Sequence, residues 1–208
     1  ACGTWYRAAS DRCPVCGAEV VRDEDGAALR CTGAECPAQL LRNLTHFASR
    51  NAMDIDGLGP AVIQQLVDSG LVRTAADLYS LRPEQIAELD RMGQKSARNA
   101  VEAIARSRED DLWRLIFALG IRQVGEKAAK VLAARFGSMD ALSTATEEEL
   151  TAIDDVGPIT AKYIRQWMDS PQSQDLLARL KAAGLNMTCK EEMVDRRFAG
   201  MTFVLTGA

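Results

Sequence analysis

A five-residue pattern that recurs four times constrains the fold of this chain more than any other feature of its sequence. The pattern is apolar-x-x-apolar-Gly, and its copies occupy residues 55–59, 89–93, 121–125 and 153–157. The closing glycines follow one another at intervals of 34, 32 and 32 residues. A unit repeated at nearly constant spacing predicts a repeat architecture in which each copy is one supersecondary element. Three of the closing glycines are followed four residues later by an alanine, whose small side chain lets helices pack closely: Ala97, Ala129 and Ala161.

The third copy indicates which element repeats. An apolar segment, 112–119, leads into it, Gly120 and Gly125 bracket it, and an alanine-rich segment, 126–135, follows. Glycines at both ends of a tight turn permit unusual backbone conformations and close approach of a partner. The following helix presents unpaired N–H groups at the positive end of its dipole, which suits a phosphate. An ordinary αα-hairpin is the alternative, but fourfold repetition favours helix-hairpin-helix elements that bind the DNA backbone. We number them hairpins one to four.

The charge distribution qualifies this prediction. The net charge of −4 argues mildly against nucleic acid, whose binding usually requires a basic surface. However, residues 91–135 carry ten Lys or Arg against five acids, whereas residues 137–175 carry two against eight. Hairpins two and three lie in the basic part, and backbone amides read phosphates rather than bases. We therefore expect these two hairpins to hold duplex DNA without sequence specificity.

Hairpins one and four are expected to hold DNA less than hairpins two and three, and hairpin four is expected to be mainly structural. Pro60 and Pro158 follow their closing glycines, and each removes an N–H that a phosphate could use. Acids also stand in their turns, at Asp56, Asp154 and Asp155. The residues predicted at the DNA interface are Gly57, Gly59, Arg91, Gly93, Lys95, Arg98, Gly120, Arg122, Val124, Gly125 and Lys127.

Four cysteines near the start of the chain have metal-ligand spacing. Two residues separate Cys13 from Cys16, and four separate Cys31 from Cys36. The segment between the pairs, with an Asp-Gly turn at 25–26, predicts a short β-hairpin. Four thiolates fill a tetrahedral zinc site, which makes the site structural rather than catalytic. Disulfides are the rival interpretation, but the knuckle spacing and the absence of a secretion signal favour zinc.

The other metal-ligating side chains lie outside this cluster. His46 is expected to be a packed side chain, and Cys2 and Cys189 to be spare thiols. No apolar run approaches the roughly 20 residues that span a bilayer. The predicted fold is mainly α: a tail or tag at 1–12, a zinc finger at 13–37, four helix-hairpin-helix repeats at 38–187, and a linker at 188–208 that ends in a first β-strand.

The order of these parts resembles the C-terminal half of bacterial NAD-dependent DNA ligases, and the resemblance covers nearly the whole chain from residue 12. Cys-Pro-Ala-Gln at 36–39 and Met-Asp-Ile-Asp-Gly-Leu-Gly at 53–59 are especially close to that family. The terminal Phe-x-Gly-x-Thr-Phe-Val-Leu-Thr-Gly strand at 198–207 resembles the start of its BRCT domain.

The resemblance implies nick sealing in DNA replication and repair: NAD adenylates a lysine, AMP passes to the 5′-phosphate, and the 3′-hydroxyl attacks. That lysine lies in Lys-x-Asp-Gly, and none of the six lysines here begins this motif. The resemblance therefore implies no catalytic and no NAD-binding residue in this chain, with NAD and Mg²⁺ used by the full-length enzyme. The expected partners are nicked duplex DNA and the adenylation and OB domains of the same parent chain.

The fragment is expected to be a monomer of the bacterial cytosol and nucleoid, without membrane contact, that clamps duplex DNA and is inactive alone. Two alternatives stay open. An accessory region of a nuclease or polymerase explains the hairpins but not the zinc module before them. A protein-interaction module of helical repeats fits the acidic hairpins one and four better than DNA does.

Overall fold

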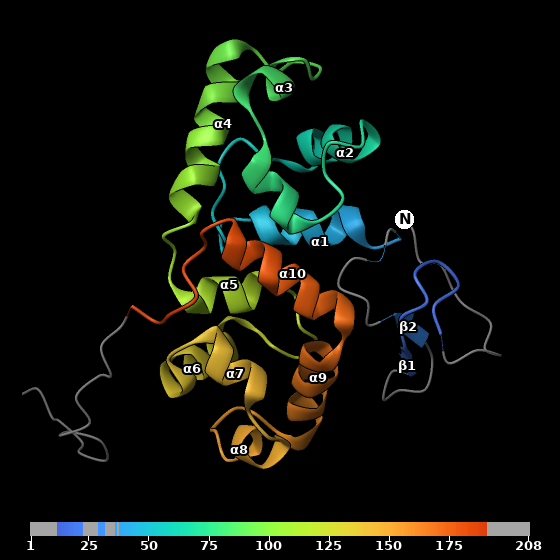
Figure 1. The fold of residues 1–208 in the computed structure, drawn as a ribbon, viewed down its shortest axis with the longest axis vertical. Coiled ribbons are helices and arrows are strands. Elements are labelled where there is room, and N and C mark those ends of the chain that lie inside the picture. The colour runs from blue at the N-terminus through green and yellow to red at the C-terminus, as the bar shows by residue number, and fades with distance from the viewer. Residues whose placement is uncertain (1–11, 23–28, 32–35, 37, 191–208) are drawn as a thin grey trace, which may run out of the picture.

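The computed structural model describes residues 12–22, 29–31, 36 and 38–190 (Figure 1). Within these residues the fold is mainly α, as the sequence predicts, with one two-stranded sheet, ten α-helices and one 3₁₀-helix. None of the described helices is long and apolar enough to cross a membrane. The expected N-terminal tail up to residue 11, the turn at 25–26, Cys2 and the BRCT-like strand lie outside the described residues.

The zinc module is built on a short antiparallel hairpin. Strand β1 (Val20–Arg22) pairs with β2 (Leu29–Cys31), and Val20 lies opposite Cys31. This confirms the β-hairpin expected between the two cysteine pairs. Arg12 forms a β-bridge with Glu19, and its guanidinium donates to the Gly17 carbonyl at 3.1 Å. Arg12 therefore belongs to the zinc module and not to the tail in which its sequence position placed it.

Each repeat folds as two helices joined by a turn. Hairpin one is α1 (Leu40–Ala48) and α2 (Pro60–Asp68), and hairpin two is α3 (Pro83–Ala87) and α4 (Gln94–Ser107). Hairpin three is α5 (Leu112–Ala118) and α6 (Glu126–Phe136), and hairpin four is α8 (Glu147–Thr151) and α9 (Pro158–Asp169). The connecting elements are η1 (Ala75–Ser80), α7 (Met139–Thr144) and a last helix, α10 (Pro171–Ala182).

Local sequence signals account for several of the helix ends. Ser138 and Thr146 cap α7 and α8, and Thr146 forms a capping box with Glu149. Gly137 ends α6 in the left-handed conformation, with a φ of 70°. Helix α10 begins at Pro171, because proline suits the first helical position.

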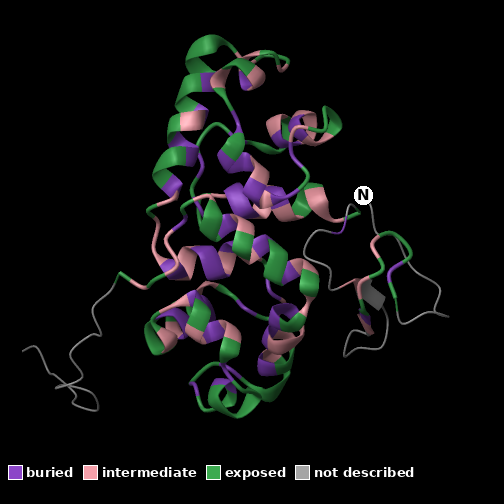
Figure 2. Cartoon of the chain, viewed as in Figure 1, coloured by how far each residue is buried: buried purple, intermediate pink, exposed green. Residues whose placement is uncertain are grey.

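The hairpins share one apolar core. Hairpins one and two form the upper part of the helical body in Figure 1, hairpins three and four form the lower part, and α10 lies across the boundary. Buried residues follow the inner faces of both parts (Figure 2). Ala97, Ala129 and Ala161 are each 0% exposed, as their spacing predicts. The zinc module has a separate, small core.

The helical body continues past the expected boundary at residue 187. Thr188 forms an isolated antiparallel β-bridge with Ser138. The Cys189 amide donates to the Gly137 carbonyl at 2.8 Å, and the Lys190 amide donates to Asp111 Oδ2 at 3.0 Å. Residues 188–190 are therefore fixed to the body rather than being the start of a linker.

Candidate metal centre and hairpin turns

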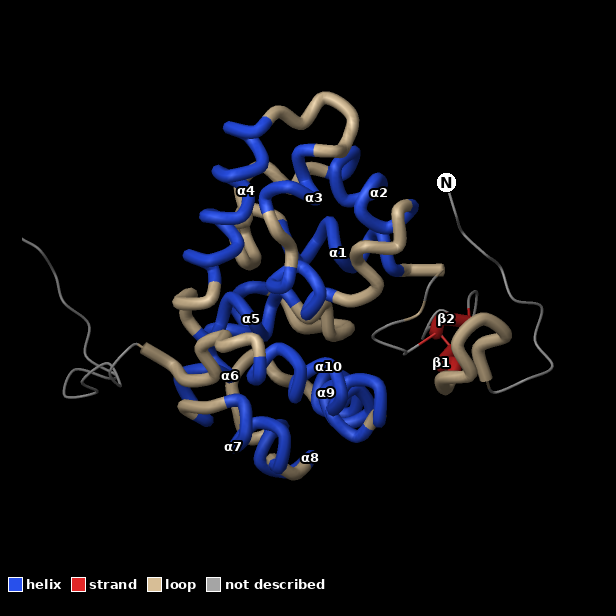
Figure 3. Tube along the Cα trace, turned by 45° about the horizontal axis from the view of Figure 1, so that its top comes forward, coloured by secondary structure: helices blue, strands red, loops and turns tan. Residues whose placement is uncertain are grey.

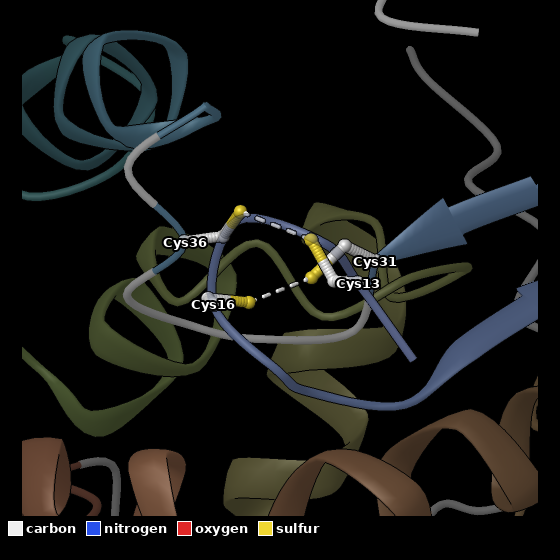
Figure 4. Close-up of side chains that lie close together, drawn as sticks. All are labelled: Cys13, Cys16, Cys31 and Cys36. Carbon is white, nitrogen blue, oxygen red and sulfur yellow. Dashed lines mark hydrogen bonds between the residues drawn. The ribbon is translucent and has the colours of Figure 1, made fainter. Parts of the chain in front are cut away.

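The four cysteine sulfurs predicted to bind zinc meet at one point (Figure 4). All lie within 4.8 Å of one another, with 3.9 Å between the sulfurs of Cys13 and Cys36 and 3.3 Å between those of Cys16 and Cys31. A tetrahedral zinc with bonds of about 2.3 Å separates its sulfurs by about 3.8 Å. A disulfide needs about 2.05 Å. The geometry therefore fits a four-thiolate metal site and not two disulfides.

The surroundings of the sulfurs differ. Burial raises the pKa of Cys36 to about 11. Burial also raises the pKa of Cys13, but hydrogen bonds from the backbone of Cys16 and Val15 and from the thiols of Cys31 and Cys16 together outweigh it and lower that pKa to about 7. Four thiolates in so small a space repel one another, and a divalent cation removes this repulsion. The donor set is thus one that zinc would stabilise.

The zinc module depends on its ligands for a core. Among the described residues of the module, those buried in its core are Cys13, Val20 and Cys36, so two of these three are predicted ligands. A module with so little other apolar burial takes its folding free energy largely from the metal. His46 lies elsewhere: its Nε2 donates to the Phe117 carbonyl at 2.8 Å, and its ring packs edge-on against that of Phe117. His46 is a packed side chain, as expected.

The four turns of the helical body have the same backbone geometry. In each, the amide of the fourth residue donates to the carbonyl of the first, over 3.4, 3.0, 3.0 and 3.1 Å in chain order. The third residue is always left-handed, with φ of 89° at Gly57, 63° at Arg91, 61° at Gln123 and 69° at Asp155. The unusual conformation therefore lies two residues before the closing glycine.

The closing glycines themselves have ordinary backbone conformations. Gly59, Gly93, Gly125 and Gly157 have φ between −71° and −87° and form the N-caps of α2, α4, α6 and α9. None of the four helices has a side-chain cap, and a Cβ at any of these glycines would meet nothing within 4 Å. The unusual backbone conformation expected at the glycines that bracket the third turn is not found at Gly125, because its φ of −83° suits any residue. What these glycines provide is open surface over the first amides of each helix.

Two of the glycines predicted at the DNA interface have a structural role in the body. Gly57 has a φ of 89°, and a Cβ there would lie 3.2 Å from the Cβ of Ala100 on α4. Gly120 has a φ of 64° just after α5, and a Cβ there would lie 3.5 Å from the His46 ring. Val124 is also internal: its side chain is 6% exposed and belongs to the core. The sequence pattern alone does not distinguish a residue that packs inside the helical body from one that lies at its surface.

The predicted basic side chains fall into two groups. Arg91, Lys95 and Arg98 are exposed around the turn of hairpin two and the start of α4. The basic residues of hairpin three interact with hairpin four. The ammonium of Lys127 lies 2.9 Å from Asp155 Oδ2, and the half-buried Arg122 has its guanidinium 4.8 Å from the centre of the Tyr163 ring.

These contacts show how the hairpins associate. The turn of hairpin one packs against α4 through Gly57, and the turn of hairpin two is held to α2, where Gln65 bonds the Asp90 backbone amide at 2.7 Å. Likewise, hairpin three contacts α9, and the turn of hairpin four contacts α6 through Asp155. The hairpins therefore form an upper pair, one with two, and a lower pair, three with four.

Charge alone grouped hairpins two and three, which the structure places in different pairs. Sequence reasoning missed Gln65, Asp155 and Tyr163 as the residues that join the pairs. The available signal was the order of the hairpins, since elements adjacent in the chain tend to pack together.

Comparisons with known proteins agree with this division. Residues 12–38 match the family model of the NAD-dependent DNA ligase C4 zinc finger domain. Residues 49–106, which cover the upper pair except α1, match a SAM-like helix-hairpin-helix tandem. Residues 114–177, which cover most of the lower pair and the start of α10, match a helix-hairpin-helix motif.

Curated relatives extend the similarity to 94–95% of the chain. Proteins named DNA ligase are 53% identical over 198 residues in Trichlorobacter lovleyi, 52% over 202 residues in Marinobacter nauticus and 51% over 201 residues in Bacillus thuringiensis. The chain spans 29–30% of the length of these relatives.

Proposed function

We propose that this chain is the duplex-binding region of an NAD-dependent DNA ligase, the family whose C4 zinc finger model its residues 12–38 match. In the proposal, the two hairpin pairs grip the sugar-phosphate backbone of nicked DNA without reading its sequence. The remaining domains of the parent protein carry out the sealing reaction.

The observation that carries the proposal is the start of the four second helices, α2, α4, α6 and α9. Each begins at a glycine that neither the backbone conformation nor internal packing requires. The first amides of each helix have no partner within the helix. A phosphate oxygen accepts from such amides and is attracted by the helix dipole, provided that no side chain covers them. A glycine N-cap meets that condition.

We further propose that hairpins two and three supply most of the affinity. Helices α4 and α6 begin with residues that retain their amides, and Lys95 and Lys127 stand in their first turns. In α2 and α9 the first residue is Pro60 or Pro158, which has no N–H. Gly93 and Gly125 are therefore the proposed phosphate-binding positions.

The zinc proposed for Cys13, Cys16, Cys31 and Cys36 has a structural role. All four tetrahedral positions would be filled by thiolates, which leaves none for water or substrate. The metal would fix the β-hairpin beside the lower part of the helical body (Figure 1, Figure 3). Gln172 of α10 donates to the Cys16 carbonyl there at 3.4 Å.

Nick sealing is proposed for the parent protein and not for this chain. No lysine in the sequence begins a Lys-x-Asp-Gly motif, so no residue is placed to accept AMP from NAD. Incubation with labelled NAD and nicked duplex should leave the chain unlabelled. Transfer of label to the chain would show that the adenylation chemistry has been assigned to the wrong part of the protein.

Titration of a fluorescent nicked duplex at several salt concentrations tests the proposal. Binding through phosphates must weaken steeply as salt rises, because each contact releases a condensed counterion. Binding should also be equal for unrelated base sequences. Absence of duplex binding at low salt would instead support a protein-interaction module.

A further inference from the structure

We infer that Arg108 and Arg179 are positioning residues that fix the two hairpin pairs in one orientation, so that both pairs hold the same duplex at once. This inference rests on the proposed duplex binding. It adds that the grip is bivalent and that its geometry is set away from the DNA-facing turns.

Arg108 connects the end of the upper pair to the last helix. It follows α4 directly, and its Nε donates to the carbonyl of Ala183, at the end of α10, at 2.9 Å. Its Nη2 donates to the Tyr79 carbonyl in η1 at 3.0 Å, and its guanidinium lies 5.4 Å from the centre of the Tyr79 ring. One half-buried side chain thus joins three elements: α4, η1 and α10.

Arg179 makes a second connection from the last turn of α10. Its Nη2 lies 2.7 Å from Asp77 Oδ1 in η1. The other carboxylate oxygen of Asp77 accepts from the amides of Arg73 and Thr74, each at 2.9 Å, so the acid is itself held in place. The side chains of Arg179 and Asp77 are 38% and 28% exposed, which makes the ion pair better shielded than a surface pair.

Helix α10 is continuous in sequence with the lower pair. Ser170 alone separates it from α9, yet its contacts through Arg108 and Arg179 are with η1 and α4 of the upper part. Figure 1 and Figure 3 both show α10 against α9 and close to the upper half. Helix α10 therefore acts as a brace between the pairs.

The hydrogen bonds of Arg108 and Arg179 fix the angle between the two hairpin pairs, which apolar contact alone does not do. Apolar contact between the halves already exists in the shared core and is non-directional. A guanidinium, by contrast, donates along fixed directions to carbonyls and carboxylates, so it defines an angle between the elements it joins.

A fixed angle matters for a ligand that contacts both pairs. When two binding modules are linked, the second contact gains an effective concentration that is lost if the geometry is wrong. A body of about 150 residues is about 40 Å across, which corresponds to about 12 base pairs at about 3.4 Å per phosphate along a strand. A stem of 8 base pairs should therefore engage one pair at a time, and a duplex of 24 should engage both.

The test compares the double variant Arg108→Gln/Arg179→Gln with wild type on both ligands. The ligands are a nicked 24-base-pair duplex and an 8-base-pair stem closed by a loop. The charge-matched control is Arg106→Gln/Arg135→Gln, two exposed arginines. We expect the Arg108→Gln/Arg179→Gln variant, the brace variant, to bind the long duplex about tenfold more weakly than wild type. Linked binding increases affinity roughly 100-fold or more, and the variant should lose part of this increase. On the short stem it should lose less than twofold, whereas the control should lose the same factor on both.

Equal losses on the two ligands, or none on either, in a folded brace variant would overturn the inference. A wild-type chain that binds neither ligand would overturn the proposed function instead, so the two failures are distinguishable. Thermal melts establish folding. The single variant Arg179→Gln, at a partly exposed site, provides a milder version that should show the same dependence on duplex length.

Discussion

Replacing Gly125 with serine separates a structural role of this glycine from a role in DNA binding. Gly125 has a φ of −83° and a ψ of 178°, it caps α6 without a side-chain hydrogen bond, and a Cβ there would contact nothing within 4 Å. Serine fits this conformation, and its hydroxyl oxygen accepts from an amide of the first turn. The substitution should therefore improve the helix while it covers the surface that a phosphate would use.

The expected change in stability is small and favourable. A serine N-cap stabilises a helix by a few tenths of a kcal/mol more than glycine does. Replacing glycine where the conformation is compatible adds roughly 0.4–1 kcal/mol, because the unfolded chain has fewer states. A gain of about 0.5–1 kcal/mol corresponds to a rise of about 1–4 °C in Tm for a chain of this size.

The expected change in DNA affinity has the opposite sign. The serine oxygen would compete with phosphate for the amides of α6, and its bulk would keep the phosphate at a distance. Loss of one or two charge-assisted hydrogen bonds at a partly exposed site costs about 1–2 kcal/mol. That corresponds to a roughly 5- to 30-fold increase in Kd for nicked duplex.

The matched control is Gly157→Ser in hairpin four. Gly157 has a φ of −75°, no side-chain cap and the same open space, so the stability gain should be equal. Pro158 removes one amide there, so the increase in Kd should be less than twofold. Fluorescence anisotropy with nicked duplex and thermal melts by circular dichroism measure the two effects. Equal loss of affinity at both positions, or a lower Tm for Gly125→Ser, would refute the reasoning.

Three further predictions concern the metal, the lower hairpin pair and a buried phenol. Elemental analysis should find one zinc per chain, and less than half a zinc per chain would count against the site. The substitution Cys36→Ser should loosen the zinc module without shifting the main unfolding transition, since the two cores are separate. Asp155→Asn should strengthen duplex binding, because it releases Lys127 from its ion pair and removes a negative charge. The energy of an exposed ion pair corresponds to an increase in affinity of about two- to fivefold. Unchanged binding would place Lys127 away from DNA. Burial raises the pKa of Tyr79 to about 12, so its absorbance at alkaline pH should titrate late. Because its pKa is higher in the folded state, its contribution to stability is complete below its unfolded pKa near 10 and is lost as pH rises towards 12.

Much of the fold is predictable because its signals are local. Glycine and proline mark the helix ends, cysteine spacing marks the metal site, and Thr146 with Glu149 marks a capping box. The apolar segment 112–119 and the alanine-rich segment 126–135 match α5 and α6 to within one residue. These features depend on neighbours in the chain, which a single sequence displays directly.

The arrangement of the hairpins depends on contacts that the sequence does not display. Lys127 meets Asp155 and Arg122 meets Tyr163 only after two turns fold and pack. The left-handed position in each turn is equally hidden, because a glycine occupies it only at Gly57 and other residues occupy it elsewhere. Composition therefore indicated a basic region but not which hairpins share a face.

The most direct test of phosphate binding is the salt dependence of the affinity of the whole chain for nicked duplex. If two to four phosphates are held by amides and basic side chains, the logarithm of the association constant should fall linearly with the logarithm of salt concentration, with a slope of about −2 to −4. Two duplexes of unrelated sequence should give the same line. Affinity that is independent of salt, or that differs more than tenfold between the two sequences, would contradict the account.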